Sequence, residues 1–214
     1  ESKAKLLRPE CTHGDQGLMM HYDTFRQFGP FDEFPSMLAE TRLAERIRQT
    51  GQLTLIPVEI FTSARRFETE GLYQRQVLNA ILMNCANQGW GEPFRAVSDL
   101  YRNQPDAGEL QLPPLLNRIR QLIEDLSPAE RRRFWRSTGC YVRGNAWQLA
   151  FLLDVRRNFK KGAEPGNGPT PILDRFDRAI APMLDGRPFD FLATALTWTW
   201  FNLTRLHSLV CSKL

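Results

Sequence analysis

The clearest pattern of apolar and polar positions lies over residues 72–87. Apolar side chains recur there every three or four residues, the spacing that places them on one face of an α-helix. The same spacing predicts helices over residues 36–51, 114–126 and 190–214. Shorter helices are predicted over 93–103 and over 172–184, the second one capped by Thr170 and Pro171.

Residues 53–62, LTLIPVEIFT, fit two structures. Their β-branched side chains favour a strand, whereas Pro57 suits the first turn of a helix that runs to Gly71. We predict the helix. The sequence therefore indicates an all-α fold, a single compact multi-helix domain of about seven to nine helices with an irregular N-terminal arm.

The strongest local signal is the segment SPAE, which begins at Ser127. Serine suits the N-cap, Pro128 the first helical position, and Glu130 can reach back to the cap, so the segment predicts a capping box. The following arginines therefore stand on a helix. We predict that residues 137–144 interrupt it, and that a second helix, capped by Asn145 with Gln148, runs to about Lys161.

Glycine and proline divide the chain into four parts. Residues 1–35 show no sustained period and form the predicted arm, and residues 36–161 form a helical body that carries a basic segment over 118–161. Residues 162–171 hold three glycines and three prolines, which is typical of a hinge. Residues 172–214 are predicted to form C-terminal helices packed on the body.

Composition indicates a folded protein inside the cell. Hydrophobic residues make up 42% of the chain, enough for a core, and the four cysteines show no disulfide-framework spacing. No uncharged apolar stretch is long enough to span a membrane, and the first residues lack the apolar centre of a signal peptide. We expect a cytoplasmic or nuclear protein that is not secreted. A first residue other than methionine suggests a piece of a longer chain.

Positive charge is concentrated in one segment. The net charge is +4, but residues 118–161 hold nine arginines and two lysines against four carboxylates, so this segment carries +7 and the remainder −3. Arginine supplies 23 of the 28 basic residues, and its planar guanidinium suits phosphate and carboxylate groups. An anionic partner is indicated, although a genome rich in arginine codons would explain the preference equally well.

The arginines of the SPAE helix lie in its first turn, where the helix dipole disfavours each cation by about 0.3–1 kcal/mol. Either Glu124, Asp125 and Glu130 offset this cost, or an external anion does. Cations in the last turn of the next helix are favoured by its dipole and need no partner. The candidate nucleic-acid or anion-binding residues are Arg131, Arg132, Arg133, Arg136, Arg143, Arg156, Arg157, Lys160 and Lys161, with Trp135 and Tyr141 as stacking surfaces.

Aromatic residues predict a second kind of contact. Four phenylalanines of the arm, at three-residue spacing, either dock on the body or bind a partner, and Gly29-Pro30 prevents one helix through them all. The last helix reads as a central core helix, yet its two tryptophans cannot face the same way. A protein-interaction or homo-oligomerisation domain is therefore the alternative function, with Phe25, Phe28, Phe31, Phe34, Trp198 and Trp200 as partner-binding residues.

Residues able to bind zinc are present without a zinc motif. Cys11 and His13 of the arm could join His207 and Cys211, which lie one helical turn apart, in a structural site. We expect no other cofactor. Cys140 lies near two arginines that would lower its pKa, so an enzyme that uses this thiol or a metal is a further alternative.

Known catalytic motifs are absent from the sequence. We therefore expect a non-catalytic binding module, a regulatory or assembly protein. Its first candidate partner is nucleic acid, especially single-stranded, and an acidic protein surface is the second.

Overall fold

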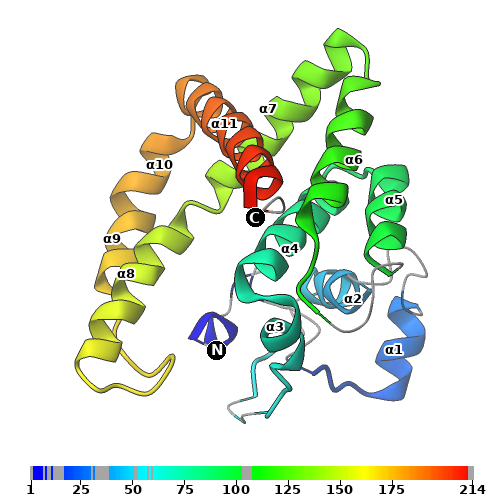
Figure 1. Ribbon diagram of the computed structural model, residues 1–214. Coiled ribbons are helices and arrows are strands. Elements are labelled where there is room, and N and C mark those ends of the chain that lie inside the picture. The colour runs from blue at the N-terminus through cyan, green and yellow to red at the C-terminus, as the bar shows by residue number, and fades with distance from the viewer. Residues whose placement is uncertain are drawn as a thin grey trace. The chain divides into compact units, whose positions relative to one another are not determined.

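The computed structural model describes residues 2–6, 8, 11, 17–29, 31, 39–50, 53–56, 58, 60–102 and 108–211, without the side chains at 92–94, 102 and 211. Every regular element within these residues is helical (Figure 1), so the predicted all-α class is confirmed. The contacts group the chain into two compact units. Unit 1 comprises Glu1–Ser63 and Phe151–Leu173, and unit 2 comprises Ala64–Ala150 and Asp174–Leu214.

Unit 1 contains more helix than the predicted irregular arm. A short 3-10 helix, η1, spans Ser2–Lys5, and α1 spans Tyr22–Phe28. Helix α1 ends because Gly29 adopts φ of 84°, a backbone conformation that glycine accepts without strain. Helix α2, Ala39–Arg48, buries Leu43, Ala44 and Ile47 as the apolar spacing predicted.

A buried carboxylate organises the other half of unit 1. Helix α8, Trp147–Lys160, carries Asp154, whose side chain is fully buried. Its two oxygens accept hydrogen bonds from the Ile172 N–H at 3.2 Å and the Leu173 N–H at 2.8 Å. These N–H groups open helix α9, Pro171–Arg175, and have no partner within their own helix. The sequence predicts that Thr170 and Pro171 cap this helix. The carboxylate that accepts hydrogen bonds from its first N–H groups is instead that of Asp154 on α8.

The helix predicted from Pro57 to Gly71 forms only in its second half, because the described residues between 53 and 64 form no helix. Helix α3, Arg65–Glu70, begins only after this segment and ends before Gly71. Ile56 precedes a proline, which disfavours helical backbone, and the β-branched neighbours lose rotamer freedom in a helix. Most of these apolar side chains are exposed; Phe61 is 97% exposed. No buried face therefore compensates for weak helix propensity.

Unit 2 is built around α4, Leu72–Asn87, whose bounds agree with the prediction. Helix α5, Gly91–Arg102, packs on α4, and helix α6, Leu112–Glu124, packs on α5. The predicted stripe is mostly buried, although Leu72 itself is exposed. Burial raises the pKa of the Cys85 thiol to about 12, so this cysteine is an inert core residue. The buried apolar side chains of α4 and α6 are Val77, Leu78, Ile81, Leu82 and Cys85 of α4 and Leu112, Leu115, Leu116, Ile119 and Ile123 of α6.

Helix α7, Pro128–Gly144, is continuous, so the predicted interruption at 137–144 is wrong. Gly139, which suggested a break, is instead the point where α7 approaches α11, Arg187–Cys211. A Cβ added to Gly139 would lie 2.6 Å from the Thr194 main-chain nitrogen and 2.7 Å from its Cα. The glycine serves close helix packing rather than a turn.

The segment from α9 to Leu184 is helical throughout. A π-helical turn, Phe176–Ile180, joins α9 to α10, Ala181–Leu184, where one regular helix was predicted. Asp185 and Gly186 then turn the chain into α11. Within the described residues, no helix combines the length and the hydropathy needed to cross a membrane.

Candidate nucleic-acid interface

Helix α7 begins at a capping box that fixes its basic first turn. The Ser127 hydroxyl accepts a hydrogen bond from the Glu130 N–H at 3.4 Å, and the Glu130 carboxylate accepts one from the Ser127 N–H at 3.0 Å, so the predicted capping box is confirmed. Hydrogen bonds from the Ser127 hydroxyl and N–H lower the pKa of the Glu130 carboxyl, and Arg133 lowers it further. The Glu130 carboxylate is therefore engaged by the end of its own helix.

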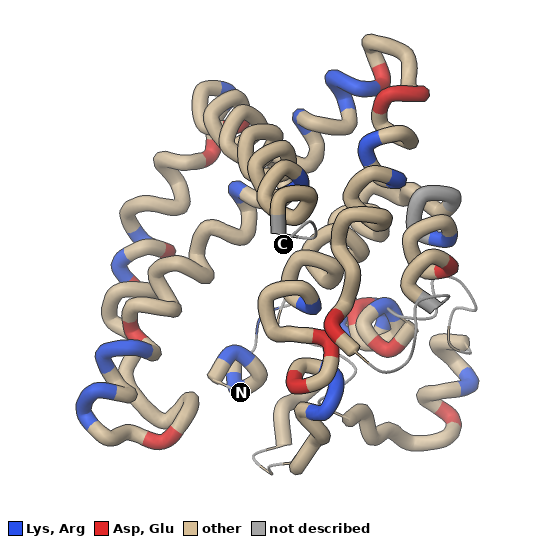
Figure 2. Tube along the Cα trace, viewed as in Figure 1, with Lys and Arg blue, Asp and Glu red and all other residues tan. Residues whose placement is uncertain are grey.

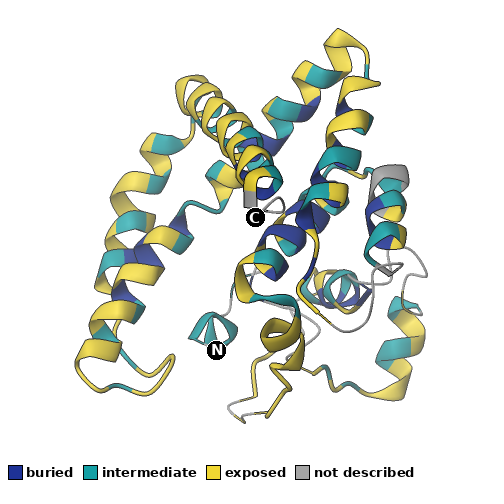
Figure 3. Ribbon diagram, in the orientation of Figure 1, coloured by how far each residue is buried: buried dark blue, intermediate teal, exposed yellow. Residues whose placement is uncertain are grey.

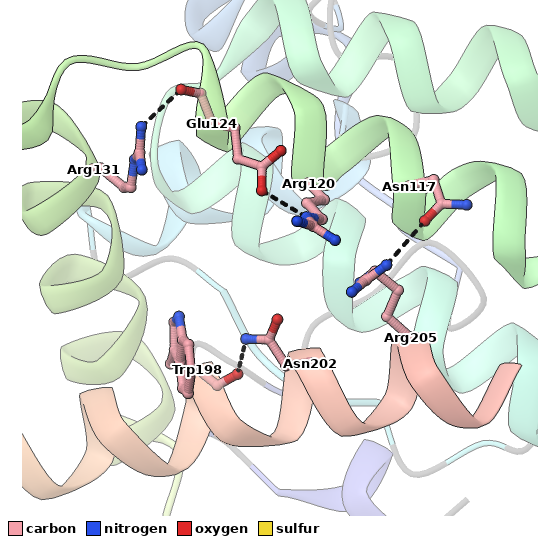
Figure 4. Close-up of polar contacts among 7 residues, drawn as sticks. All are labelled: Asn117, Arg120, Glu124, Arg131, Trp198, Asn202 and Arg205. Atoms are coloured by element: carbon pink, nitrogen blue, oxygen red, sulfur yellow. Dashed lines mark hydrogen bonds and ion pairs between the residues drawn. The ribbon is translucent and has the colours of Figure 1, made fainter. Parts of the chain in front are cut away.

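Arg131 binds main-chain carbonyl groups at the end of α6. Its Nη2 donates to the Glu124 carbonyl oxygen at 2.7 Å, as Figure 4 shows, and to the Leu126 carbonyl oxygen at 3.2 Å. The Glu124 carboxylate instead pairs with Arg120 Nε at 2.6 Å. A cation at the C-terminal end of a helix is favoured by the helix dipole. Arg131 thus joins α7 to α6 through neutral carbonyl groups, and none of the described carboxylates forms an ion pair with it.

Arg132, Arg133 and Arg136 form what we call the α7 basic surface. All three side chains are exposed, and none forms a hydrogen bond or an ion pair with another described residue. Arg132 and Arg136 lie one helical turn apart and therefore project from the same side. Figure 2 shows basic positions along α7 and acidic ones gathered at the corner between α6 and α7. Internal pairing thus applies to Arg131, while these three guanidinium groups remain open to an external anion.

Arg143, which the sequence assigned to the same surface, is held inside unit 2. It forms ion pairs with Asp185 and with Asp190, each at 2.9 Å, and also donates to the Leu184 carbonyl oxygen at 2.7 Å. The hydrogen bond to Asp185 is the main reason that the pKa of Arg143 is raised. Arg143 therefore joins the end of α7 to the start of α11, and its structural role differs from the predicted one.

Cys140 lies next to this ion-pair cluster. Burial raises the pKa of its thiol, and a hydrogen bond to Asp190 raises it further, against the smaller opposing effects of Arg143 and Arg136. The prediction of a lowered pKa for Cys140 is therefore wrong, because it left out burial and the carboxylate of Asp190, which together outweigh the two arginines. A protonated thiol is a poor nucleophile, so the structure does not favour the reactive-cysteine alternative.

Trp135 belongs to a row of aromatic rings inside unit 2. Its ring centroid lies 5.2 Å from Phe134 and 5.7 Å from Phe201, and Phe134 stacks on Trp90 at 4.3 Å. These contacts pack α7 against its neighbours and leave Trp135 and Tyr141 only partly accessible. Neither residue is an open stacking surface of the kind predicted.

An exposed aromatic side chain on the side of Arg120 and Arg131 is Trp198, which is 51% exposed (Figure 4). Figure 4 shows Trp198, Asn202 and Arg205 rising from α11 on the side where Arg120 and Arg131 lie. The Asn202 side-chain amide donates to the Trp198 carbonyl oxygen at 2.8 Å, which leaves the amide oxygen available. Arg205 Nη1 lies 3.5 Å from the Asn117 side-chain oxygen, at the limit of a hydrogen bond.

Sequence reasoning placed Trp198 in a partner surface and did not select Arg120, Asn202 or Arg205. The Arg120–Glu124 spacing of four residues on a predicted helix was a usable signal. Nothing local linked Arg205 to α6, because that contact depends on the packing of distant segments.

The second predicted basic cluster lies in unit 1. Arg156, Arg157 and Lys160 are exposed near the end of α8, and Lys161 is exposed just beyond it. The helix dipole favours cations at this position, so no external partner is needed to explain them. Because the two basic clusters belong to different units, each is treated as a separate surface.

The phenylalanines of the arm contact one another within unit 1. The ring centroids of Phe25 and Phe31 lie 5.7 Å apart, and Phe25 and Phe28 are half-buried on α1. Phe34 lies outside the described residues. Trp200, the second predicted partner-binding residue of α11, is exposed like Trp198. A partner-binding role for these residues stays a prediction.

The structure gives no support to the predicted zinc site. Among the described residues, no three histidine, cysteine or acidic side chains come close enough to hold a metal ion. Cys11 is buried in unit 1, whereas His207 is exposed on α11 in unit 2. His13 and the side chain of Cys211 lie outside what the structure describes.

No family model, no curated protein and no solved structure matches the chain.

Proposed function

We propose that unit 2 is a non-catalytic binding module that holds single-stranded nucleic acid along the α7 basic surface. The observation that carries the proposal is the contrast in pairing among the arginines of α6 and α7. Arg120 and Arg143 have carboxylate partners, whereas Arg132, Arg133 and Arg136 have none among the described residues. Three open guanidinium groups on one helix suit a chain of phosphates.

The first turn of α7 adds to this argument. Arg131 lies in this turn, at the unfavourable end of the helix dipole, and Arg132 and Arg133 directly follow it. The Glu130 carboxylate is engaged by Ser127. Glu130 is the one carboxylate of α7 near these side chains and interacts electrostatically with Arg133, whereas no hydrogen bond or ion pair to Arg132, Arg133 or Arg136 is formed among the described residues. A bound polyanion would supply further negative charge beside them. The carbonyl contacts of Arg131 hold the first turn against α6, so the guanidinium groups are presented from a fixed helix end.

Trp198 favours a single strand over a duplex. Its half-exposed indole lies on the side of α11 that faces Arg120 and Arg131 (Figure 4). Unpaired bases stack on aromatic side chains, which contributes about 1–3 kcal/mol per base, whereas the bases of a duplex are not accessible for stacking. The half-buried Arg205 lies on the same side and adds positive charge.

The proposal is tested by fluorescence anisotropy with a labelled single-stranded oligonucleotide of mixed sequence. The test variant is Arg132→Ala/Arg133→Ala/Arg136→Ala. The matched control is Arg156→Ala/Arg157→Ala/Lys160→Ala, which removes the same charge from exposed positions of unit 1. We expect the test variant to weaken binding at least about tenfold and the control to bind within about threefold of the wild type.

Salt dependence provides an independent readout. If three phosphates are neutralised, the logarithm of the affinity should fall with the logarithm of salt concentration with a slope of about −2, which is roughly a 20-fold loss between 50 and 200 mM. The test variant should show a flatter slope. Trp198→Ala should weaken binding about tenfold at every salt concentration, and Trp198→Phe should retain most of the affinity because it keeps a stacking ring.

Three outcomes contradict the proposal. Equal binding by the wild type and the α7 variant would remove the α7 basic surface from the interface. Loss of binding in the unit 1 control alone would show that the binding site lies on α8 instead. Preference for an acidic peptide over the oligonucleotide, lost in the α7 variant, would keep the surface but replace nucleic acid with an acidic protein.

A further inference from the structure

Helix α11 has an unusual distribution of side chains between its two faces. The face that packs on α7 and α6 is mostly polar or small. Its hydroxyl groups bond to carbonyl oxygens of α11 itself: Thr194 to Asp190, Thr197 to Ala193 and Ser208 to Arg205. Because these groups are satisfied locally, they can be buried without partners on other helices. The residues of this inner face are Asp190, Thr194, Thr197, Phe201, Thr204 and Ser208.

The opposite face of α11 is apolar and exposed, as Figure 3 shows along its visible side. Six residues lie along it at alternating spacings of four and three, and we call them the outer stripe. Leu196 is 61% exposed and Leu203 is 60% exposed, near the middle of the helix. A soluble helix normally turns its leucines inward, so the distribution is the reverse of that expected for a surface helix. The outer stripe consists of Leu192, Leu196, Thr199, Leu203, Leu206 and Val210.

The spacing of the outer stripe has a specific structural meaning. Apolar residues that alternate at four and three positions are the signature of a helix that pairs lengthwise with another helix, with side chains of each filling spaces on the other. The small Thr199 near the centre allows close approach. Five of the six positions are aliphatic, which matches the apolar seam of such a pair.

The exposed area is large enough for a stable contact. Apolar patches beyond a few hundred Å² on a protein surface mark interaction sites. Together with the flanking Phe191 and Trp200, the outer stripe exposes on the order of 800 Å² of apolar surface, the amount that each partner of a standard interface contributes. Trp198 lies on a different side of α11, toward α6, so the proposed nucleic-acid surface and the outer stripe do not compete.

We propose that the outer stripe of α11 pairs with the outer stripe of a second copy of this chain. The sequence from Phe191 to Thr204 contains no charged residue, so two copies meet here without like-charge repulsion. An acidic or basic partner would gain nothing from a face that offers no charge. A leucine seam is self-complementary, which is what a two-fold symmetric contact requires.

The test measures mass in solution by sedimentation or light scattering, with nuclease-treated protein at high salt so that bound nucleic acid cannot link copies. We expect twice the chain mass of 24.7 kDa for the wild type. The test variant is Leu196→Glu/Leu203→Glu, which places carboxylates in the seam. We expect it to raise the dissociation constant at least about 100-fold, because unpaired charges in an apolar contact are strongly unfavourable.

The matched control is Leu72→Glu/Leu149→Glu, which changes two leucines of unit 2 that are 64% and 69% exposed and lie outside α11. The control should remain dimeric, and circular dichroism should show wild-type helix content in both variants. A monomeric wild type at about 100 μM, where a micromolar contact is mostly formed, would overturn the proposal. So would a test variant that stays dimeric, or a control that dissociates equally.

Because the mass measurement uses no nucleic acid, it can succeed or fail independently of the proposed binding function. A monomeric protein that binds the oligonucleotide would reject only the α11 contact. A dimer that binds no oligonucleotide would reject only the α7 basic surface.

Discussion

The two ends of α7 carry the same residue type in opposite circumstances. In the N-terminal half, Arg132, Arg133 and Arg136 are exposed and have no ion-pair partner among the described residues. At the end, Arg143 lies between Asp185 and Asp190 and also holds a carbonyl oxygen of α10. Ion pairs thus hold the C-terminal end of α7 in place, whereas the arginines of its N-terminal half are exposed to solvent.

This difference shows that an arginine-rich segment does not have one role. Neighbours decide whether a guanidinium group stabilises the fold or remains available, and those neighbours come from elsewhere in the chain. Asp185 and Asp190 follow Arg143 by more than 40 residues. An estimate of charge along the sequence counts all these arginines equally, whereas the structure divides them between stability and binding.

The largest expected effect on stability is at the C-terminal end of α7. Arg143→Ala should lower the free energy of unfolding by about 3 kcal/mol, because it leaves the mostly buried Asp190 carboxylate without its cation. Urea denaturation followed by circular dichroism measures the loss. The comparison variant Arg132→Ala should stay within about 0.5 kcal/mol of the wild type, as for other exposed sites. Equal losses in the two variants would contradict the division between the ends.

The middle of α7 should show the next largest effect. Gly139→Ala places a methyl group against the main chain of Thr194 and should cost about 2 kcal/mol, because the helices must move apart. The control is Gly144→Ala in the same helix, where nothing lies within 4 Å of the added Cβ. This control should be neutral or slightly stabilising. A stable Gly139→Ala protein would mean that α7 and α11 are not in close contact.

A smaller effect on stability is expected at the N-terminal end of α7. Ser127→Ala removes the N-cap hydroxyl and should lower the free energy of unfolding by about 1 kcal/mol, measured again by urea denaturation. Ser137→Ala, in the interior of the helix, serves as the control and should change stability little. If the two substitutions have the same effect, the capping box does not contribute to stability in solution.

The smallest effect concerns pH. Hydrogen bonds from Ser127 lower the pKa of Glu130 in the folded protein, so its ionised form contributes stability above its ordinary pKa, and this contribution is lost as pH falls through the lowered value. The difference in unfolding free energy between wild type and Glu130→Gln should therefore shrink from pH 7 to pH 3. A difference that grows on acidification would reverse the assigned direction of the pKa change.

Local signals predicted a good part of the fold. The capping box at Ser127, the bounds of α4 and the continuous last helix were predicted because each depends on residues within a few turns of one another. The segment 53–64 was predicted wrongly for the opposite reason. Its helix propensity was weak, and no buried face was available to compensate.

The site was less predictable, because it depends on tertiary contacts. Gly139 resembled a helix break, but its missing side chain allows α11 to approach. The threonines of α11 suggested a core helix, and Thr194, Thr197 and Thr204 do lie inward, yet most of its leucines face outward. The partners of Arg131 are main-chain carbonyl groups. Every residue has one, so the sequence does not indicate which carbonyl groups are free to accept a hydrogen bond.

The path of the chain between the two units has a practical consequence. Unit 1 is assembled from 1–63 and 151–173, and unit 2 from the two segments that alternate with them, so neither unit corresponds to a continuous piece of the gene. A deletion up to residue 63 would leave residues 151–173 without the segment they fold with. Expressing unit 2 alone therefore requires a short engineered linker from Ala150 to Asp174, not a simple truncation.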